Sequence, residues 1–130
     1  MSLSTLAFMG IQALPRLRLL PSILPLLPFV VIFAAMNAFS EEMSFRAALL
    51  APLDGKVTRQ QSLLLTAFFF GIAHWDGMPN GVTGVLMSGV LGWLLGKSML
   101  ETRGYFWAWF IHFTQDIIVF AFVALGMIGR

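Results

Sequence analysis

Apolar runs long enough to cross a lipid bilayer follow one another along almost the whole sequence. Of the 130 residues, 58% are hydrophobic and only 11% are charged, whereas a typical soluble domain has roughly 25% charged residues. So few charges cannot cover a surface that faces water. A helix needs about 20 apolar residues to cross a bilayer core of roughly 30 Å. The sequence therefore predicts an all-α fold, a polytopic membrane helical bundle of about four transmembrane helices.

Short polar segments divide the apolar sequence into these four helices. They carry the Gly, Pro, Asn and Asp residues that tight turns need. We interpret residues 1–130 as a single membrane-embedded core, with an interfacial lead-in over 1–16. The four spans are predicted at Phe29–Leu53, Ser62–Trp75, Val82–Leu100 and Tyr105–Ile128, the second of them short.

Prolines precede the first span and charged residues interrupt it, and both are unusual in a membrane helix. Pro21, Pro25 and Pro28 are expected to kink the helix or delay its start. Polar and charged residues then interrupt the apolar run, so either one helix continues through them or the span ends near Phe39; these residues are Asn37, Ser40, Glu41, Glu42, Ser44 and Arg46. In the first case the charges lie at membrane depth, where each costs roughly 2.5–3.5 kcal/mol. They would then have to be paired, neutralised or hydrated.

Ionisable side chains within the apolar helices are the candidate functional groups, because the chain has no cysteine. Glu42 and Arg46 are four residues apart, so they share a helix face and can form an ion pair. Glu41 lies about 100° further round the helix, where its carboxylate can act as a general base. His112 and Asp116 are also four residues apart, so the carboxyl group can hydrogen-bond the imidazole and fix its tautomer.

The remaining histidine closes the second predicted helix. Phe70 precedes His74 by four residues, which places an aromatic ring beside the imidazole. Three helices therefore each carry polar groups within an apolar sequence. Their convergence would build one hydrated pocket inside the membrane. The small residues Gly84, Ser88, Gly92 and Gly96 recur every fourth position of the third span and predict a smooth face for close helix packing.

Three motifs, in order and on successive helices, resemble those of the CPBP (Abi, or CAAX protease and bacteriocin-processing) intramembrane endopeptidases. The motifs are Glu41-Glu42-x-x-x-Arg46, Phe70-x-x-x-His74 and His112-x-x-x-Asp116. The resemblance implies that Glu41 is the general base and that His74 is its partner on the attacking water. It also implies that His112 with Asp116 faces the oxyanion, while Glu42 and Arg46 hold the first helix in place.

The last motif position differs from that of the eukaryotic-type CAAX proteases, which carry Asn where this chain has Asp116. An amide can donate a hydrogen bond to an oxyanion, but an ionised carboxylate cannot. Either Asp116 is protonated by its surroundings, or it orients His112 while His112 alone donates to the oxyanion. We favour the second interpretation.

The sequence alone does not decide whether the enzyme uses zinc. Relatives are often described as metalloproteases, yet the sequence lacks the H-E-x-x-H pattern of helical zinc sites. We therefore favour a glutamic-type mechanism without a cofactor. If zinc is bound, its ligands are expected to be His74, His112, Glu41 and Asp116.

The predicted activity is that of a hydrolase, an intramembrane endopeptidase that cleaves a membrane-associated protein substrate, with a C-terminal sorting or lipidated tail as one candidate region. The alternative is a non-catalytic immunity or scaffold protein of the same fold, and a small transporter or proton channel is a weaker third option. A homo-oligomer is one option, because relatives carry additional N-terminal helices and a second copy of this chain could supply the substrate-binding parts that those helices form. We expect a multi-pass protein of the bacterial inner membrane. The scattered basic residues, with a net charge of +2, form no cluster for nucleic acid.

Overall fold

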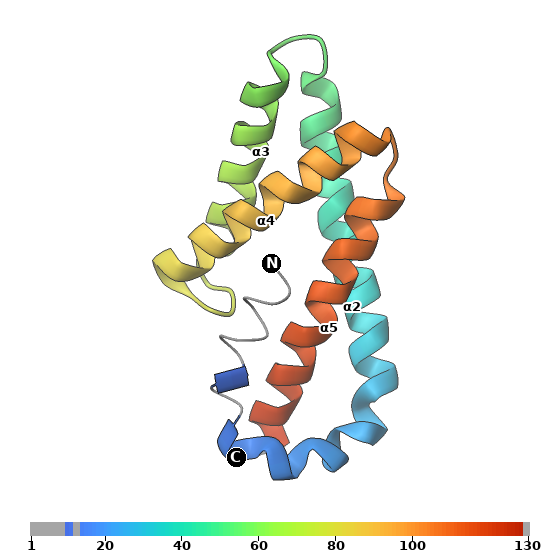
Figure 1. The fold of residues 1–130 in the computed structure, drawn as a ribbon, viewed down its shortest axis with the longest axis vertical. Coiled ribbons are helices and arrows are strands. Elements are labelled where there is room, and N and C mark those ends of the chain that lie inside the picture. Colours follow the sequence, from blue (N-terminus) through green and yellow to red (C-terminus); the bar gives the residue numbers. More distant parts are fainter. Residues whose placement is uncertain (1–9, 12–13, 129–130) are drawn as a thin grey trace. The chain divides into compact units, whose positions relative to one another are not determined.

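The computed structural model describes residues 10–11 and 14–128, and helices account for nearly all of them. No β-strand occurs among these residues, so the predicted all-α fold is confirmed. The interfacial lead-in predicted over 1–16 lies largely outside the described residues. Figure 1 shows the elements in chain order: η1 (Leu14–Leu26), α2 (Leu27–Glu42), η2 (Met43–Leu50), η3 (Ala51–Leu53), α3 (Arg59–Ala73), α4 (Gly81–Thr102) and α5 (Phe106–Ile128).

The prolines delay the first α-helix, as the sequence predicts. Pro21 and Pro25 lie within η1, a 3₁₀ helix of 13 residues, and the α-helical geometry of α2 begins only at Leu27. Pro28 is the second residue of α2, where its missing N–H has no intrahelical partner to lose. α-Helical geometry thus begins only after Pro21 and Pro25, and Pro28 lies in the first turn of α2, where proline is tolerated.

One helical stretch continues through the polar interruption of the first span. α2 leads directly into η2, which is a π-helix, and η2 leads into the short 3₁₀ turn η3. The whole stretch Arg18–Leu53 is 36 residues long with a mean hydropathy of 2.3. Of the two readings of this region, the continuous helix is therefore correct. The charges of Glu41, Glu42 and Arg46 lie within an apolar helix and not beyond its end.

Among the residues that the structure describes, three helices are long and apolar enough to cross a membrane, namely Arg18–Leu53, Gly81–Thr102 and Phe106–Ile128. The protein is an integral membrane protein. The second predicted span corresponds to α3, which has 15 residues. At about 1.5 Å per residue such a helix is shorter than a bilayer core of roughly 30 Å. α3 therefore differs from the other three in lacking the length to cross the core on its own.

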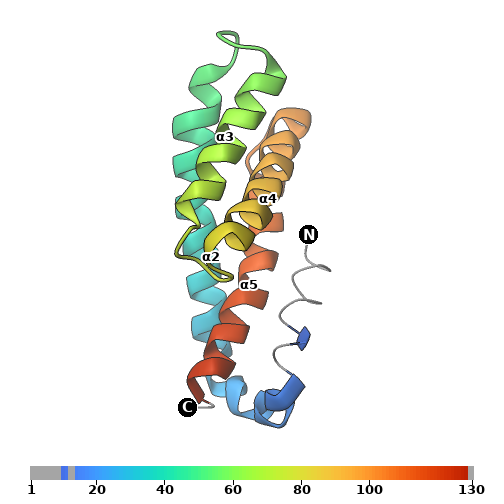
Figure 2. The same ribbon diagram turned by 90° about the vertical axis from the view of Figure 1, so that its left-hand side faces the viewer.

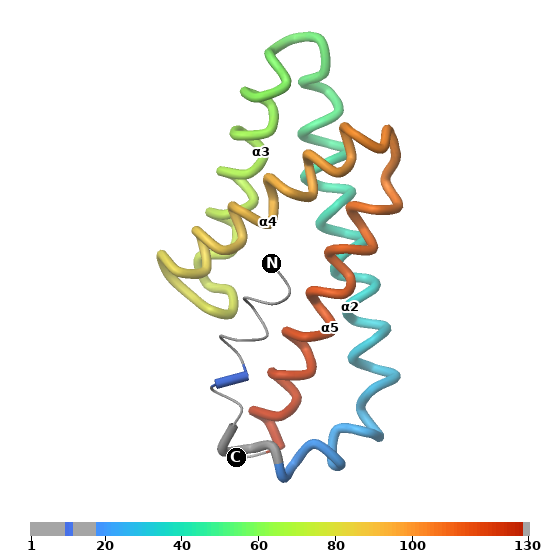
Figure 3. The backbone as a smooth tube through the Cα atoms, viewed as in Figure 1, coloured from blue at the N-terminus to red at the C-terminus, as the bar shows by residue number. Residues whose placement is uncertain are grey.

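α3 starts three residues earlier than predicted because a capping box fixes its first turn. The Thr58 side chain accepts from the backbone N–H of Gln61, and the Gln61 side chain accepts from the backbone N–H of Thr58. The preceding turn contains Gly55 at φ +72°, a conformation that glycine adopts without steric cost. Figure 3 shows the backbone turning back between η3 and α3 at this point.

The chain divides into two compact units, Phe39–Ile111 in one and Met1–Ala38 with His112–Arg130 in the other. In the first unit α3 packs along α4 and η2, which Figures 1 and 2 show from two sides. A Cβ at Gly71 of α3 would come 2.7 Å from the Val85 carbonyl oxygen of α4, so this packing requires glycine. In the second unit Ile23 packs against Leu125, with Leu19, Leu26 and Phe122 around them.

The small-residue face predicted on α4 is confirmed in the same unit. A Cβ at Gly84 would clash with the Pro79 carbonyl oxygen, and one at Gly96 would lie 3.0 Å from the Leu63 side chain. A Cβ at Gly92 would likewise lie 3.0 Å from the Phe70 side chain. α4 can approach α3 this closely because these positions carry no side chain.

Candidate active site

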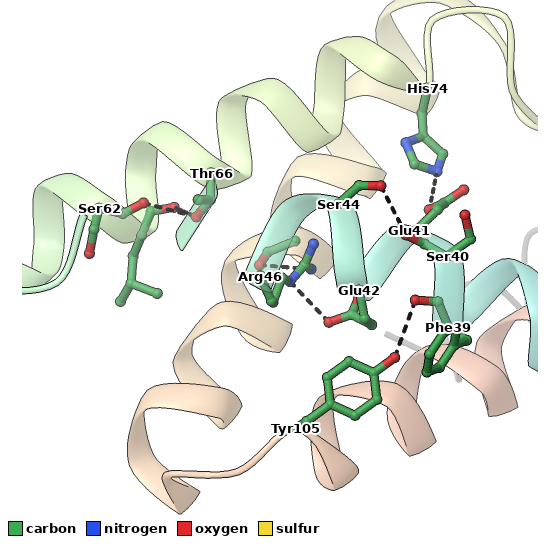
Figure 4. A network of polar contacts seen from close by, with 12 residues as sticks. Phe39, Ser40, Glu41, Glu42, Ser44, Arg46, Ser62, Thr66, His74 and Tyr105 are labelled. Atoms are coloured by element: carbon green, nitrogen blue, oxygen red, sulfur yellow. Dashed lines mark hydrogen bonds and ion pairs between the residues drawn. The ribbon is translucent and has the colours of Figure 1, made fainter. Parts of the chain in front are cut away.

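Glu41 and His74 meet in the Phe39–Ile111 unit. Glu41 lies in the last turn of α2 and His74 lies just after the end of α3. The Oε2 atom of Glu41 is 3.4 Å from Nε2 of His74, and both side chains are about one quarter exposed, at 25% and 26%. Figure 4 shows the imidazole pointing at the carboxylate. The family resemblance predicts this pair, and both side chains are partly exposed.

A hydrogen bond of the second ring nitrogen fixes the tautomer of His74. Its Nδ1 lies 2.7 Å from the backbone carbonyl oxygen of Phe70. A carbonyl oxygen can only accept, so Nδ1 must carry a proton and donate. In the neutral imidazole the lone pair is then on Nε2, the nitrogen that faces Glu41. A carboxylate oxygen and a lone pair that face each other need either a shared proton or a molecule that donates to both.

Glu42 and Arg46 form the predicted ion pair on the neighbouring face of the helix. Nε of Arg46 is 3.1 Å from Oε2 of Glu42, and both side chains are completely buried. Nη2 of Arg46 also donates to the backbone carbonyl oxygen of Gly92 at 3.3 Å. Arg46 thereby connects η2 to α4. A buried pair of this kind strongly destabilises a protein when one partner is removed.

The Phe70 ring lies between the ion pair and the Glu41–His74 pair. The guanidinium carbon of Arg46 is 4.5 Å from the centroid of this ring, which is a cation–π distance. The imidazole of His74 lies 4.5 Å from the same centroid, at an interplanar angle of 37°. Phe45 of η2 adds an edge contact at 5.0 Å. Phe70 is fully buried, so its ring positions both the arginine and the histidine.

Tyr105 contacts the backbone two residues before Glu41. Its hydroxyl group donates to the Phe39 carbonyl oxygen at 3.2 Å, as Figure 4 shows, and the two rings meet edge to face at 5.9 Å. Burial, together with the nearby negative charge of Glu42, raises the pKa of Tyr105 from 10.0 to about 12. The phenol therefore stays protonated and keeps donating at any pH below 10.

His112 and Asp116 lie together in the other unit, on α5. Nε2 of His112 is 3.6 Å from Oδ1 of Asp116, and both residues are buried. The second carboxyl oxygen of Asp116 accepts a hydrogen bond from the Asn37 side-chain amide at 3.1 Å. Asp116 therefore contacts the imidazole with one oxygen and α2 with the other. This arrangement is the one expected of a carboxyl group that orients a histidine.

The structure thus brings the predicted residues together in two groups. Glu41, Glu42, Arg46, Phe70 and His74 form one group, and His112 with Asp116 forms the other. Within the described residues no three His, Asp or Glu side chains gather closely enough to hold a metal ion. In the first group Glu42 is paired with Arg46, which leaves Glu41 and His74 as the side chains facing each other, and the second group offers His112 and Asp116. Donation from Nδ1 of His74 to a carbonyl oxygen is also a contact that metal-ligating histidines commonly make.

Comparison with known protein families places this geometry in context. The family model of the Type II CAAX prenyl endopeptidase Rce1-like proteins matches residues 23–118, which is most of the chain and includes every residue of these two groups. The chain belongs to this family. No curated protein and no solved structure matches it. Membership of the Rce1-like family makes the protein a membrane-embedded protease of the CAAX type, as the three motifs predict.

Three contacts of this Rce1-like chain were missed from the sequence. Asn37 is predicted only as part of the polar interruption of the first span, and its hydrogen bond to Asp116 is not predicted. Gly92 is assigned only to helix packing, although its carbonyl oxygen also accepts from Arg46. Tyr105 is predicted only as the first residue of the fourth span, and no local pattern indicates that its hydroxyl group reaches Phe39.

Proposed function

We propose that this protein hydrolyses a peptide bond of a membrane-associated protein substrate, with Glu41 and His74 holding the attacking water. The observation that carries the proposal is the Glu41–His74 contact at 3.4 Å, combined with the donation from Nδ1 of His74 to Phe70. A water molecule can donate one hydrogen to the carboxylate and the other to the Nε2 lone pair. Both acceptors then polarise the same oxygen, which is the requirement for general-base activation of water.

Proton transfer through Glu41 balances the proposed reaction. Glu41 takes a proton from the water as the water oxygen bonds to the scissile carbonyl carbon. The same carboxyl group then delivers the proton to the departing amide nitrogen, and the C–N bond breaks. The products are a carboxylic acid and an amine, so no oxidant or further reactant is needed. His74 keeps its orientation throughout, because Phe70 holds its Nδ1–H.

The role that we propose for His112 and Asp116 comes from their motif positions. His112 would donate to the oxyanion that forms on the scissile carbonyl, and Asp116 would orient it. The His112–Asp116 contact of 3.6 Å and the Asn37 hydrogen bond support the orienting role of Asp116. Losing one oxyanion donor typically reduces kcat by about 10²–10³-fold. His112→Ala is therefore expected to lower kcat more than it raises KM.

The decisive test compares cleavage by the wild type with that by Glu41→Gln and His74→Ala. Each full-length variant is expressed in cells that lack the gene, and new C-termini of membrane proteins are identified by mass spectrometry of terminal peptides. We expect a defined set of cleaved termini with the wild type and none with either variant. Both variants should reach normal levels in the membrane, because neither residue belongs to the fully buried ion pair.

Glu101→Gln is the matched control, since it makes the same chemical change at a side chain that is 52% exposed. It should leave the cleaved termini unchanged. Normal cleavage by Glu41→Gln would contradict the proposed mechanism. Identical termini with and without the gene would favour the non-catalytic immunity or scaffold alternative.

A further inference from the structure

A cavity of about 680 Å³ lies within the Phe39–Ile111 unit, away from the residues assigned to catalysis. Its walls come from the end of η2, the turn that leads into α3, the start of α3 and the end of α4. Its lining includes apolar residues such as Leu50, Val57 and Met99, together with the two arginines Arg59 and Arg103. The cavity therefore combines an apolar wall with two cations.

The cavity lies at the depth where lipid headgroups are found. Two of the membrane-spanning helices end beside it, one at Leu53 and the other at Thr102. The ends of membrane spans lie at the interface between hydrocarbon and water, where aromatic residues such as Tyr105 are also enriched. A ligand that enters here from the bilayer meets the apolar wall with its glycerol region and the arginines with its headgroup.

The charges around the cavity favour an anion. Arg59 and Arg103 line it together with one acid, Asp54. The only other acid near this end, Glu101, already contacts two cations, Arg59 at 3.5 Å and Lys97 at 3.9 Å. With Lys56 in the adjoining turn, four basic residues therefore face two acidic ones.

The backbone at Arg103 is a second, independent observation. Arg103 caps the C-terminus of α4 in the left-handed conformation, with φ 51° and ψ 34°. Glycine or asparagine fills such a position at lower steric cost. The arginine instead places a guanidinium group at the cavity, although a residue with no charge would end the helix more easily.

We propose that this cavity binds the phosphate of an anionic membrane lipid. Arg59 and Arg103 donate to the phosphate oxygens, since a guanidinium fork matches phosphate geometry. The apolar wall contacts the glycerol region and the first methylene groups. The same phosphate chemistry could come from a soluble phosphate ester, which would use the arginines but not the apolar wall.

The test measures lipid binding to the purified full-length protein in neutral detergent. Phosphatidylglycerol, zwitterionic phosphatidylcholine and inorganic phosphate are titrated separately, and bound lipid is counted by native mass spectrometry while the melting temperature is recorded. We expect saturable binding of phosphatidylglycerol with a raised melting temperature, and weaker binding of phosphatidylcholine. A response to inorganic phosphate equal to that of the lipid would reject the lipid as the ligand.

Variants separate the cavity from the general basic surface. Arg103→Asn removes the charge but keeps a residue that tolerates the left-handed backbone, so the fold should persist. It is expected to weaken phosphatidylglycerol binding about tenfold, the effect of losing one hydrogen bond to a charged group. Arg59→Gln should weaken binding to a similar extent. If Arg59→Gln also lowers the melting temperature of the lipid-free protein, its loss of binding could reflect a damaged fold, and the result for Arg103→Asn decides the test.

Lys56→Gln is the matched control, because it removes one positive charge from the same end of the unit but not from the cavity wall. It should change the affinity less than twofold. Equal weakening by Lys56→Gln and Arg103→Asn would show non-specific attraction and overturn the proposal. Displacement of bound lipid by a short peptide with a free C-terminal carboxylate, at lower concentration than by lipid itself, would also overturn it in favour of a peptide site.

Discussion

Arg46 combines three contacts that each depend on its position. It pairs with Glu42, donates to the Gly92 carbonyl oxygen and lies over the Phe70 ring. Arg46→Ala leaves the Glu42 charge buried without its cation, and breaking a buried pair in this way costs about 3–5 kcal/mol. We therefore expect Arg46→Ala to lower the folded yield and the midpoint of denaturant unfolding in detergent, together with activity.

Two further variants distinguish the charge of Arg46 from its shape. Arg46→Lys keeps the charge but loses the planar group that stacks on Phe70, so it should recover only part of the stability. The double variant Glu42→Gln with Arg46→Met removes both charges and should be more stable than Arg46→Ala alone. A stable Arg46→Ala protein that has lost only activity would instead indicate an arginine that binds substrate.

At Gly92, α4 can pack closely against α3 because glycine has no side chain. A Cβ at this position would lie 3.0 Å from two atoms of the Phe70 side chain, so the ring would have to shift. Because the Phe70 ring also contacts Arg46 and His74, that shift would disturb both the Glu42–Arg46 ion pair and the Glu41–His74 pair. We expect Gly92→Ala to destabilise the protein by about 1–3 kcal/mol, as overpacking does, and to reduce the rate of cleavage.

Gly89→Ala is the matched control on the same helix. Its added Cβ would lie 3.5 Å from the Ala67 carbonyl oxygen, an ordinary contact distance. Since alanine is the better helix former by about 1 kcal/mol, this variant should melt at the same temperature or higher. Equal melting temperatures and equal cleavage rates for the two variants would show that the Phe70 ring can shift without cost.

The elements that the sequence predicts well are those with a local chemical cause. Three prolines delay α2 because the residue lacks a donor, and the polar segment before α3 forms a turn because Gly55 permits a positive φ. The capping box at Thr58 and Gln61 has the T-x-x-Q spacing of such a box, and its omission explains the three-residue error at the start of α3. The π-helical geometry of η2 has no comparable signal.

At the scale of the whole molecule, spacing within one helix predicts pairs, whereas contacts between helices depend on packing. The pairs Glu42–Arg46 and His112–Asp116 follow from a separation of four residues. The Glu41–His74 contact joins two helices and rests on the family resemblance at the sequence level. Asn37 and Tyr105 were missed for the same reason, because their partners are 79 and 66 residues away.

The choice between a glutamic-type and a zinc-dependent protease concerns the whole molecule, because a catalytic zinc needs three protein ligands and one open position. In the described residues no such group of three gathers, and Glu41 with His74 supplies two. We predict that cleavage by the purified enzyme persists after prolonged treatment with 1,10-phenanthroline or EDTA. Metal analysis of the same sample should find far less than one zinc per molecule, because in the proposed mechanism the carboxylate of Glu41 acts on the water without a metal.

The chelator experiment needs a reference for complete loss of activity. Glu41→Gln supplies it when it is measured under identical conditions, with and without chelator. Loss of wild-type cleavage that added zinc restores would show that the metal takes part. In that case Glu41 and His74 would be ligands, and Glu41→Gln should lower the zinc content as well as the activity. In a metal-free enzyme Glu41→Gln should abolish activity without changing the zinc content, because the carboxylate of Glu41 then acts on the water directly.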